Sequence, residues 1–322
     1  IGGPPLLNGY LHLTRELEER LSALKKSEDT LIFSSGYNAN LGLISGLLNG
    51  DDNIIYDTCS HASLSDGIKM GKARGYKFHH NDVNDLQSVL NDKKQSCKGE
   101  IFINVEGVYS MDGDLAPLDQ IVPVCVKNNA ILIVDDAHGT GVMGEHGCGT
   151  AEHFNVCDKV DINMGTFSKT FAVQGGFISA SEPIIKYLRY FARSYMFSAS
   201  MPPVVLSAIL AGLDVIEKEP ERRRMLHDNV KYVAQKLRRC GYVTEPEAGI
   251  IALSVPVTMN IRDAAYQFHK EGIFLNAIEY PAVPVDKQMF RISIMATHTR
   301  SDLDKLIASV EEIWYKNDLI ES

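Results

Sequence analysis

The chain has 322 residues, of which 45% are hydrophobic and 23% are charged. This composition is typical of a globular protein with a sizeable core, and it excludes disordered chains and fibrous repeats. The 41 acidic residues outnumber the 32 basic ones, and the resulting net charge of −9 argues against a nucleic acid or a membrane surface as a partner. The longest apolar stretch, Val204 to Ile216, carries Asp214 and is too short to span a bilayer.

Six cysteines are scattered along a chain that is too long to need disulfide bonds, so we expect reduced thiols and a cytoplasmic location. Position 1 is Ile, and no basic segment precedes an apolar one as in a secretory signal. We therefore expect the sequence to be a trimmed or partial chain.

Short runs of apolar and β-branched residues alternate with helical patterns through the first two-thirds of the chain. Most runs are continuously apolar, as in strands that are covered on both faces. Helical patterns lie between them, for example Leu13–Leu24 and Leu118–Lys127. This alternation predicts a mainly parallel α/β sheet. The predicted strands are Thr30–Ser34, Asn53–Tyr56, Tyr76–His79, Ile101–Val105, Ile131–Val134, Asp161–Met164 and Phe177–Ala180.

The pattern changes after Met201-Pro202-Pro203, where helices and strands are consistent with a smaller α+β unit. We therefore predict a large domain over residues 1–218 and a small C-terminal domain over residues 219–322. The predicted elements are helices over Val204–Lys218, Glu221–Cys240, Arg262–Lys270 and Ser301–Lys316, and strands over Ile250–Val255, Ile273–Ala277 and Phe290–Met295.

One predicted strand ends in titratable side chains. The run Ile131–Val134 is followed by Asp135, Asp136 and, after one alanine, His138. Open α/β sheets bind ligands at the carboxyl ends of their strands, so this segment is a candidate for catalysis. One of the two aspartates could instead cap the next helix.

Two other patterns in this region carry little weight. Gly139, Gly141 and Gly144 match the G-x-G-x-x-G fingerprint, but residues 135–138 separate the strand from the first glycine, where a tight turn is required. The histidines and cysteines between His138 and Cys157 lack the C-x-x-C or H-x-x-x-H spacing of a metal site. We therefore expect neither a dinucleotide nor a metal ion here.

A lysine follows the next predicted strand. Lys169 stands just beyond it, close to the hydroxyl side chains of Thr166 and Ser168. Most lysines are solvated surface charges. Here, however, hydroxyls that can donate to a phosphate accompany a lysine that can form a Schiff base, and Asp135 ends the preceding strand. Pyridoxal phosphate (PLP) needs these groups, because an acid at its pyridinium nitrogen makes the ring an electron sink.

Further segments could complete such a site. The turn Ser34–Ala39 lies between a strand and a helix, where backbone N–H groups can hold a phosphate. His61 offers a ring for stacking on a flat cofactor, and Ser110 follows a strand and could contact the phosphate. Arg291 begins an apolar strand, where a guanidinium is costly unless paired. Its partner could be a substrate carboxylate or an internal acidic side chain.

Seven motifs in order resemble one family, the α-oxoamine synthases: S-S-G-Y, S-H-A-S, E-G-V-Y-S-M-D-G, V-D-D-A-H-G-T-G, G-T-F-S-K, F-S-A-S-M-P-P and F-R-I-S. The match covers nearly the whole chain. It implies fold type I of the PLP enzymes, with a large mainly parallel α/β domain and a smaller C-terminal α+β domain. It also implies the condensation of an amino acid with an acyl-CoA, with release of CO2, and a homodimer with shared active sites.

The same resemblance assigns roles by position. It makes Lys169 the Schiff-base lysine and Asp135 the partner of the pyridinium nitrogen. It makes His138 the group that hydrogen-bonds the phenolic oxygen, and His61 the stacking residue with a second contact to the substrate. Arg291 matches the arginine that binds the amino-acid carboxylate. The remaining residues implied to hold the cofactor are Ser35, Gly36, Tyr37, Ser110, Thr166 and, toward the neighbouring subunit, Ser200.

Within the family, G-T-F-S-K, A-R-S-Y-M-F-S-A-S-M and M-A-T-H-T are similar to bacterial serine palmitoyltransferases, whereas V-D-D-A-H-G-T-G is closer to 8-amino-7-oxononanoate synthase. Glu279 stands where several members of the biotin pathway carry Arg. Members also carry a further N-terminal segment before Gly2-Gly3 that helps to shape the acyl site, so such a segment is expected to be missing. The resemblance favours serine as the amino acid, with glycine or alanine as alternatives.

Three functions therefore compete. The first is condensation of an amino acid with an acyl-CoA, either of the serine palmitoyltransferase type or of the 8-amino-7-oxononanoate synthase or 2-amino-3-ketobutyrate CoA ligase type. The second is an aminotransferase or lyase on the same fold, which would share Lys169 and Asp135 but have no use for CoA. The third is a catalytically silent subunit, which is disfavoured because all four candidate catalytic residues are present.

Overall fold

The computed structural model describes residues 2–242 and 246–317. The chain forms two compact units. The first unit consists of Ile1–Tyr109 and Leu115–Pro220, and the second unit of Ser110–Asp114 and Glu221–Ser322. The segment Ser110–Asp114 packs tightly against the rest of the second unit, because a Cβ added to Gly113 would lie 2.5 Å from the carbonyl oxygen of Ile250. Gly113 also has a positive φ of 77°, which favours glycine.

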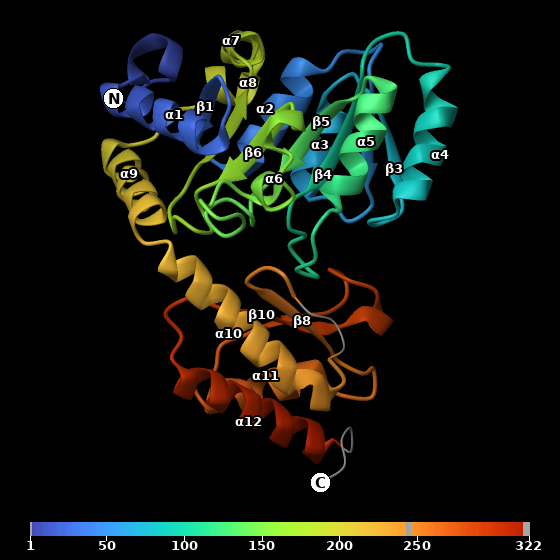
Figure 1. Ribbon diagram of the computed structural model, residues 1–322, viewed down its shortest axis with the longest axis vertical. Coiled ribbons are helices and arrows are strands. Elements are labelled where there is room, and N and C mark those ends of the chain that lie inside the picture. The colour runs from blue at the N-terminus through green and yellow to red at the C-terminus, as the bar shows by residue number, and fades with distance from the viewer. Residues whose placement is uncertain (1, 243–245, 318–322) are drawn as a thin grey trace. The chain divides into compact units, whose positions relative to one another are not determined.

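A seven-stranded sheet forms the centre of the first unit (Figure 1). Its strand order is β1-β7-β6-β5-β4-β2-β3. Strand β7 runs antiparallel to both of its neighbours, whereas the pairs from β6 to β3 are parallel. The predicted mainly parallel α/β sheet is thus confirmed. The strands are β1 (Asp29–Phe33), β2 (Asn53–Asp57), β3 (Arg74–Phe78), β4 (Ile101–Glu106), β5 (Ile131–Asp135), β6 (Ile162–Thr166) and β7 (Gly176–Ala180).

Side chains of successive strand residues alternate between the two faces of this sheet. The face that includes Ile133 packs against α2, α3 and α7. The opposite face, which includes Val134, packs against α4, α5 and α6, and α1 and α9 cover it near β1. Because both faces are covered, the strands are continuously apolar. The helices are α1 (His12–Lys25), α2 (Gly36–Leu47), α3 (Ala62–Met70), α4 (Val83–Lys94), α5 (Leu118–Asn128), α6 (Thr150–His153), α7 (Glu182–Phe191), α8 (Arg193–Met196) and α9 (Pro203–Lys218).

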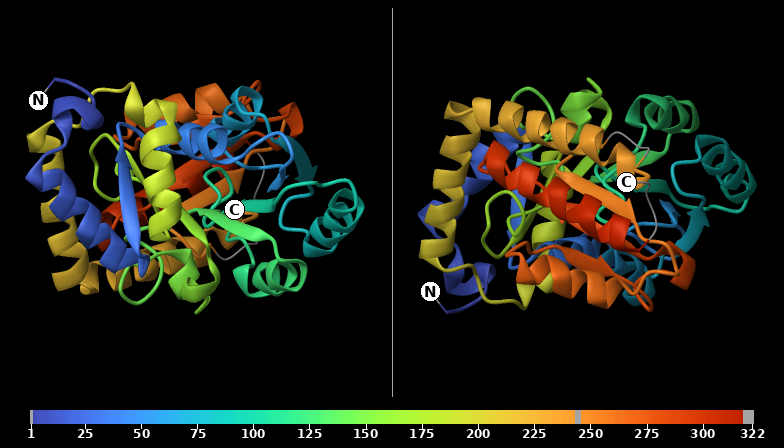
Figure 2. Two further views of the ribbon diagram at one scale, coloured as in Figure 1. Left: turned by 90° about the horizontal axis from the view of Figure 1, so that it is seen from above. Right: turned by 90° about the horizontal axis from the view of Figure 1, so that it is seen from below.

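The second unit contains a three-stranded antiparallel sheet of order β8-β10-β9. Its helices pack on one face of the sheet around Phe268, Phe290 and Trp314, and α10 and α12 lie side by side (Figure 2). Residues alternate along β10, so Arg291 lies on the face opposite to Phe290. The elements are β8 (Ile250–Ser254), β9 (Asn276–Ile278), β10 (Met289–Ser293), α10 (Glu221–Leu237), α11 (Ile261–Lys270) and α12 (Arg300–Lys316).

No helix in the described part of the chain is long and apolar enough to cross a membrane. The six cysteines, all of which lie within residues 2–242, are free thiols.

A buried acidic side chain joins α1 to α7 in the first unit. Glu18 Oε2 accepts a hydrogen bond from the hydroxyl of Tyr10 at 2.8 Å and lies 3.3 Å from Arg189 Nη2. Burial raises the pKa of Glu18 from 4.5 to about 7, although Arg189 and Tyr10 act to lower it. Burial also raises the pKa of Tyr195, whose hydroxyl accepts a hydrogen bond from Arg189, to about 12. The contact between α1 and α7 is therefore held by a carboxyl group whose charge changes near neutral pH.

This pKa predicts how stability depends on pH. Since the folded protein holds the Glu18 proton more tightly than the unfolded chain does, the free energy of unfolding falls as the pH rises from 4.5 to about 7. The fall from this one group is on the order of 3 kcal/mol. In urea unfolding curves between pH 4.5 and pH 8, Glu18→Gln is expected to lack this fall. The control Glu19→Gln, at an exposed residue paired with Arg15, should keep the wild-type dependence. A wild-type dependence in Glu18→Gln would contradict the prediction.

Candidate active site

Strand β5 ends in the two adjacent aspartates, whose side chains lie on opposite faces of the sheet. Asp135, like Ile133, faces α2, whereas Asp136 lies on the opposite face with Val134, where Lys25 at the end of α1 reaches it. The alternation of side chains along a strand is the cause. The two carboxylates therefore have separate partners and separate roles.

Asp136 forms a buried ion pair with Lys25 at the end of α1. Lys25 Nζ lies 2.7 Å from Asp136 Oδ2, and both side chains are 1% exposed. The same ammonium donates to Thr140 Oγ1 at 3.1 Å and to the carbonyl oxygen of Cys148 at 2.6 Å. Asp136 Oδ1 accepts from Thr150 Oγ1 at 2.7 Å. Since these partners use both of its oxygens, Asp136 anchors the loop between β5 and α6.

Three glycines make room for the Asp136 carboxylate. An added Cβ would lie 1.6 Å from Asp136 Oδ2 at Gly149, and 2.0 Å and 2.4 Å from Oδ1 at Gly139 and Gly107. Gly149 also has a φ of 116°, which L side chains rarely adopt. Gly139 and its neighbours thus lie in a turn folded around a carboxylate rather than in the strand-to-helix turn of a dinucleotide site.

Asp135 lies at the carboxyl end of the central strand β5. Its Oδ2 accepts a hydrogen bond from Asn40 Nδ2 of α2 at 2.7 Å, and its Oδ1 accepts one from the backbone N–H of Ala137 at 3.2 Å. Burial raises the pKa of Asp135, and these two hydrogen bonds offset part of the rise because they favour the ionised form. An acid in this setting suits a partner that carries a proton and a positive charge.

His61 caps the N-terminus of α3 and is connected to Asp135 through other side chains. Its Nδ1 accepts from the backbone N–H of Ser63 at 3.2 Å and lies 2.8 Å from Ser63 Oγ. Ser63 Oγ in turn accepts from Asn40 Nδ2 at 3.0 Å. The His61 ring is exposed, so it is free to cover a flat ligand.

The start of α2 lies directly against the end of β6. Ser35 caps the helix by accepting from Asn38 N at 3.1 Å, so the N–H groups of Gly36 and Tyr37 have no acceptor within the helix. A Cβ added to Gly36 would lie 3.0 Å from both Cβ and Oγ1 of Thr166. The predicted turn and Thr166 are therefore brought together, and the helix N-terminus is suited to an anion.

Lys169 and His138 lie in turns that follow β6 and β5. The turn after β6 is closed by hydrogen bonds from Phe167 N to Gly175 O and from Ala172 N to Lys169 O, at 3.0 and 3.1 Å. The Lys169 side chain is exposed and His138 is partly exposed. Because β5 and β6 are parallel neighbours, both turns lie at the edge of the sheet where Asp135 ends β5.

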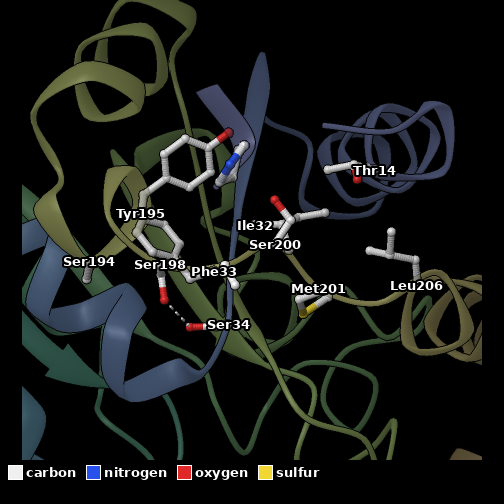
Figure 3. A pocket seen from close by; sticks show the side chains of 12 residues that line it. Thr14, Ile32, Phe33, Ser34, Ser194, Tyr195, Ser198, Ser200, Met201 and Leu206 are labelled. Carbon is white, nitrogen blue, oxygen red and sulfur yellow. Dashed lines mark hydrogen bonds between the residues drawn. The ribbon is translucent and has the colours of Figure 1, made fainter. Parts of the chain in front are cut away.

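Tyr37 follows Gly36 at the start of α2, whereas Ser200 lines a small cavity. The Tyr37 hydroxyl donates to Asp66 Oδ2 at 2.5 Å, and its ring is exposed. Ser200 lines a cavity of about 20 Å³ beside Ser34 and Ser198, whose hydroxyls are 3.3 Å apart (Figure 3). This cavity has room for about one water molecule and is too small for PLP. Ser200 Oγ is buried without a hydrogen-bond partner among the described residues.

The second unit holds the other two predicted residues, Arg291 and Ser110. Arg291 Nε donates to the carbonyl oxygen of Ser110 at 2.5 Å, and Nη1 donates to Ser293 Oγ at 3.3 Å. Burial lowers the pKa of Arg291. No acidic side chain in residues 2–242 or 246–317 forms an ion pair with it.

The residues of the first unit fit PLP. A side chain at position 36 would fill the space beside Thr166, which glycine leaves open. The helix N-terminus at Gly36 suits the phosphate of PLP. The buried Asp135 suits its ring nitrogen, Lys169 its aldehyde carbon, and the exposed His61 its flat ring.

Comparisons with known proteins show the family of the chain. The family model for aminotransferase class I and II matches residues 5–310. The chain is 39% identical over 313 residues to 8-amino-7-oxononanoate synthase of Lysinibacillus sphaericus, covering 97% of this chain and 80% of that protein. It is 38% identical over 322 residues to serine palmitoyltransferase of Sphingobacterium spiritivorum, covering 99% and 80%. The solved structure of Sphingomonas wittichii serine palmitoyltransferase superimposes with a TM-score of 0.93 at 33% identity, covering 99% of this chain and 80% of that one.

Fold and comparisons together define a PLP-dependent transferase of fold type I. The chain belongs to the aminotransferase class I and II family, and within it to the α-oxoamine synthases, which are acyltransferases.

Sequence analysis missed three residues around Asp135 and Asp136. Lys25 lies far from Asp136 in the sequence, and no local pattern indicates their pairing. Ser63 was quoted only as part of a motif. Asn40 had a detectable signal, because it is a polar residue within the apolar, buried part of α2 that contains Ala39 and Leu43.

The ion pair of Lys25 yields a test of stability. Lys25→Met keeps an unbranched side chain but leaves the Asp136 carboxylate buried without its cation, which costs about 3–5 kcal/mol. The free energy of unfolding in urea is expected to fall by this amount. The control is Lys26→Met at the next residue, where an exposed ammonium lies 3.9 Å from Glu152 Oε1. Such pairs are worth about 0–1 kcal/mol. Equal losses in the two variants would show that the pair is not the anchor.

Proposed function

We propose that the protein condenses an amino acid, preferably serine, with an acyl-CoA and releases CoA and CO2, an activity of the serine palmitoyltransferase type. The observation that carries this proposal is the buried carboxylate of Asp135 at the end of β5, next to the strand whose following turn holds Lys169. The similarity to an α-oxoamine synthase over 97% of the chain or more supports condensation rather than amino-group transfer alone.

PLP, when bound, supplies an electron sink for a bond broken at the substrate α-carbon. In this proposal Asp135 keeps a proton on the ring nitrogen. It is suited to this task because it accepts two hydrogen bonds, which favour its ionised form. Lys169 would hold the cofactor through its ε-amino group. His138 would donate to the phenolic oxygen, and His61 would cover the ring and contact the substrate carboxylate.

The remaining candidates hold the cofactor or the substrate. Arg291 binds the carboxylate of the amino acid, which is consistent with a partly buried guanidinium that has no acidic partner in the described chain. In a homodimer, Ser200 reaches the phosphate in the neighbouring subunit, which would give its unpartnered hydroxyl an acceptor. The other phosphate-side residues are Ser35, Gly36, Tyr37, Ser110 and Thr166.

The side chain of Glu279 is evidence that the acyl substrate carries no terminal charge. Its Oε1 accepts a hydrogen bond from Arg262 Nε at 2.6 Å. The pair is neutral, so position 279 offers no unpaired positive charge to an acyl chain that ends in a carboxylate. This departs from the arginine that several members of the biotin pathway carry there, and it favours the serine palmitoyltransferase type over the 8-amino-7-oxononanoate synthase type.

The direct test crosses three amino acids with three acyl-CoAs and measures free thiol. Serine with a long, uncharged acyl-CoA is expected to release CoA fastest. Alanine with an ω-carboxylated acyl-CoA would instead indicate the 8-amino-7-oxononanoate synthase type, and glycine with acetyl-CoA the 2-amino-3-ketobutyrate CoA ligase type. Lys169→Ala is the control, and it should also lose the borohydride-reducible attachment of PLP. If no pair releases thiol but the protein transfers amino groups to a 2-oxo acid, the aminotransferase alternative holds.

A second test concerns Arg291. A planar guanidinium fixes both oxygens of a carboxylate, whereas an ammonium is a point charge. Arg291→Lys is therefore expected to raise the KM for the amino acid and to slow α-proton exchange in D2O, each by about ten- to a hundred-fold, since hydrogen bonds to charged groups are worth about 1.5–3 kcal/mol. The KM for acyl-CoA should change little. A variant that exchanges protons at the parent rate but binds acyl-CoA poorly would assign Arg291 to CoA instead.

A further inference from the structure

The amide of Asn40 lies between Asp135 and the start of α3. Asn40 is 1% exposed, and its Nδ2 donates to Asp135 Oδ2 at 2.7 Å and to Ser63 Oγ at 3.0 Å. The reverse orientation of the amide would place Oδ1 against a carboxylate oxygen, and two acceptors at this distance repel each other. Both amide hydrogens are therefore in use. Oδ1 is left without a hydrogen-bond partner among the described residues.

The unpartnered Oδ1 lowers stability in a way that a leucine, which has a similar branched shape, would not. A buried acceptor without a hydrogen bond costs free energy, so an asparagine is favoured here only through the two hydrogen bonds that its amide donates. The surroundings are apolar and close-packed. A Cβ added to Gly67 of α3 would lie 3.0 Å from Ile44 Cβ and 3.4 Å from the carbonyl oxygen of Asn40. The presence of asparagine at this position is explained by its two amide hydrogens, which bind Asp135 and Ser63.

The hydrogen bonds that lead from Asn40 to His61 have a fixed direction. The backbone N–H of Ser63 can only donate, so His61 Nδ1 is an acceptor and the hydrogen of the neutral ring lies on Nε2. Ser63 Oγ accepts from Asn40, and its own hydrogen can therefore point to His61 Nδ1 at 2.8 Å. Nε2–H is thus the ring donor that His61 can offer to a ligand.

We propose that Asn40 and Ser63 are positioning residues that act through Asp135 and His61. Asn40 fixes the carboxylate of Asp135, with Ala137 N–H on its other oxygen, and through Ser63 it keeps the ring hydrogen of His61 on Nε2. The inference rests on the proposed function only in taking Asp135 and His61 as groups that contact PLP.

Several titratable groups lie near Asp135. Glu106 is its register partner on β4, Asp136 follows it in the chain, and His61 lies at the start of α3. His138 and Lys169 lie in the turns that follow β5 and β6. Asp136 raises the pKa of Asp135 and His61 lowers it, and the charge of Asp136 is countered by Lys25. Substitutions at Asn40 leave all of these groups in place, so they isolate the hydrogen bond to Asp135.

The first test follows PLP binding against pH in the intact protein. The affinity should fall as Asp135 becomes protonated. Asn40→Leu removes a donor to the ionised form, so the midpoint of this fall is expected to move upward by about 1 to 2 pH units, which is the equivalent of one hydrogen bond to a charged group. Asn40→Asp should move it further, because a second carboxylate then faces Asp135. The dissociation constant is measured by absorbance at fixed pH values between 4.5 and 9.

The matched control is Asn104→Leu. Asn104 is also 1% exposed in the first unit and has an unpartnered Nδ2 within the described chain, but it makes no hydrogen bond to Asp135. The pH midpoint of PLP binding in Asn104→Leu should equal that of the wild type. An unchanged midpoint in Asn40→Leu, or an equal shift in Asn104→Leu, would overturn the proposal.

The second test reads the His61 tautomer from 15N spectra of histidine-labelled protein, with His61→Gln to assign the signal. The wild type is expected to carry its ring hydrogen on Nε2. Ser63→Ala should give a mixture of the two tautomers, and Ser63→Thr, which retains the hydroxyl, should restore the wild-type spectrum. A wild-type ring protonated at Nδ1, or a wild-type spectrum in Ser63→Ala, overturns this part. Neither test uses acyl-CoA, so a failure of the proposed condensation is distinguishable from a failure here.

Discussion

The ion pair between Lys25 and Asp136 is the contact on which the arrangement of the candidate site depends. It joins the end of α1 to the end of a central strand, and the carbonyl oxygen of Cys148 and the side chains of Thr140 and Thr150 complete its hydrogen bonds. A buried pair of this kind contributes little net stability, since desolvation opposes the attraction. The ion pair instead restricts the loop that follows β5 to one conformation, because any other conformation would leave a buried charge unpaired.

The pair also leaves the neighbouring carboxylate, Asp135, with partners of its own. Two adjacent aspartates at the end of a strand would repel each other if they shared an environment. The alternation of side chains places them on opposite faces, where Asp136 has an ammonium and Asp135 has only neutral donors. When it is ionised, Asp135 thus carries a negative charge that no cation among the described residues pairs with. A cationic ring nitrogen is the kind of ligand atom that such a charge attracts.

Much of the fold could be predicted because the strands are covered on both faces and are therefore continuously apolar. The seven predicted strands correspond to β1–β7 with ends that differ by at most two residues. The sheet order could not be predicted, since nothing local shows that β7 inserts antiparallel between β1 and β6. The excursion Ser110–Asp114 was missed for the same reason, because its contacts are with residues of the second unit that are distant in sequence.

The candidate site shows the same limit. The motifs around Asp135 and Lys169 indicated PLP because their residue types are those that the cofactor requires. The motifs did not reveal which residues hold Asp135 and Asp136 in place, because Asn40 and Lys25 reach the two aspartates from helices that are far away in the sequence. The roles assigned to the individual site residues remain predictions.

The short connection between β6 and β7 has a kinetic consequence for Lys169. Both ends of the turn over residues 167–175 continue into adjacent strands inside the sheet, and Thr166 Oγ1 also donates to the carbonyl oxygen of Gly175 at 2.9 Å. The backbone that carries the Lys169 amine is thus localised by folding itself, before any ligand arrives. If this amine is the nucleophile of the proposed function, the entropy of placing its backbone is lost once, during folding, and its effective molarity toward a bound carbonyl is raised accordingly.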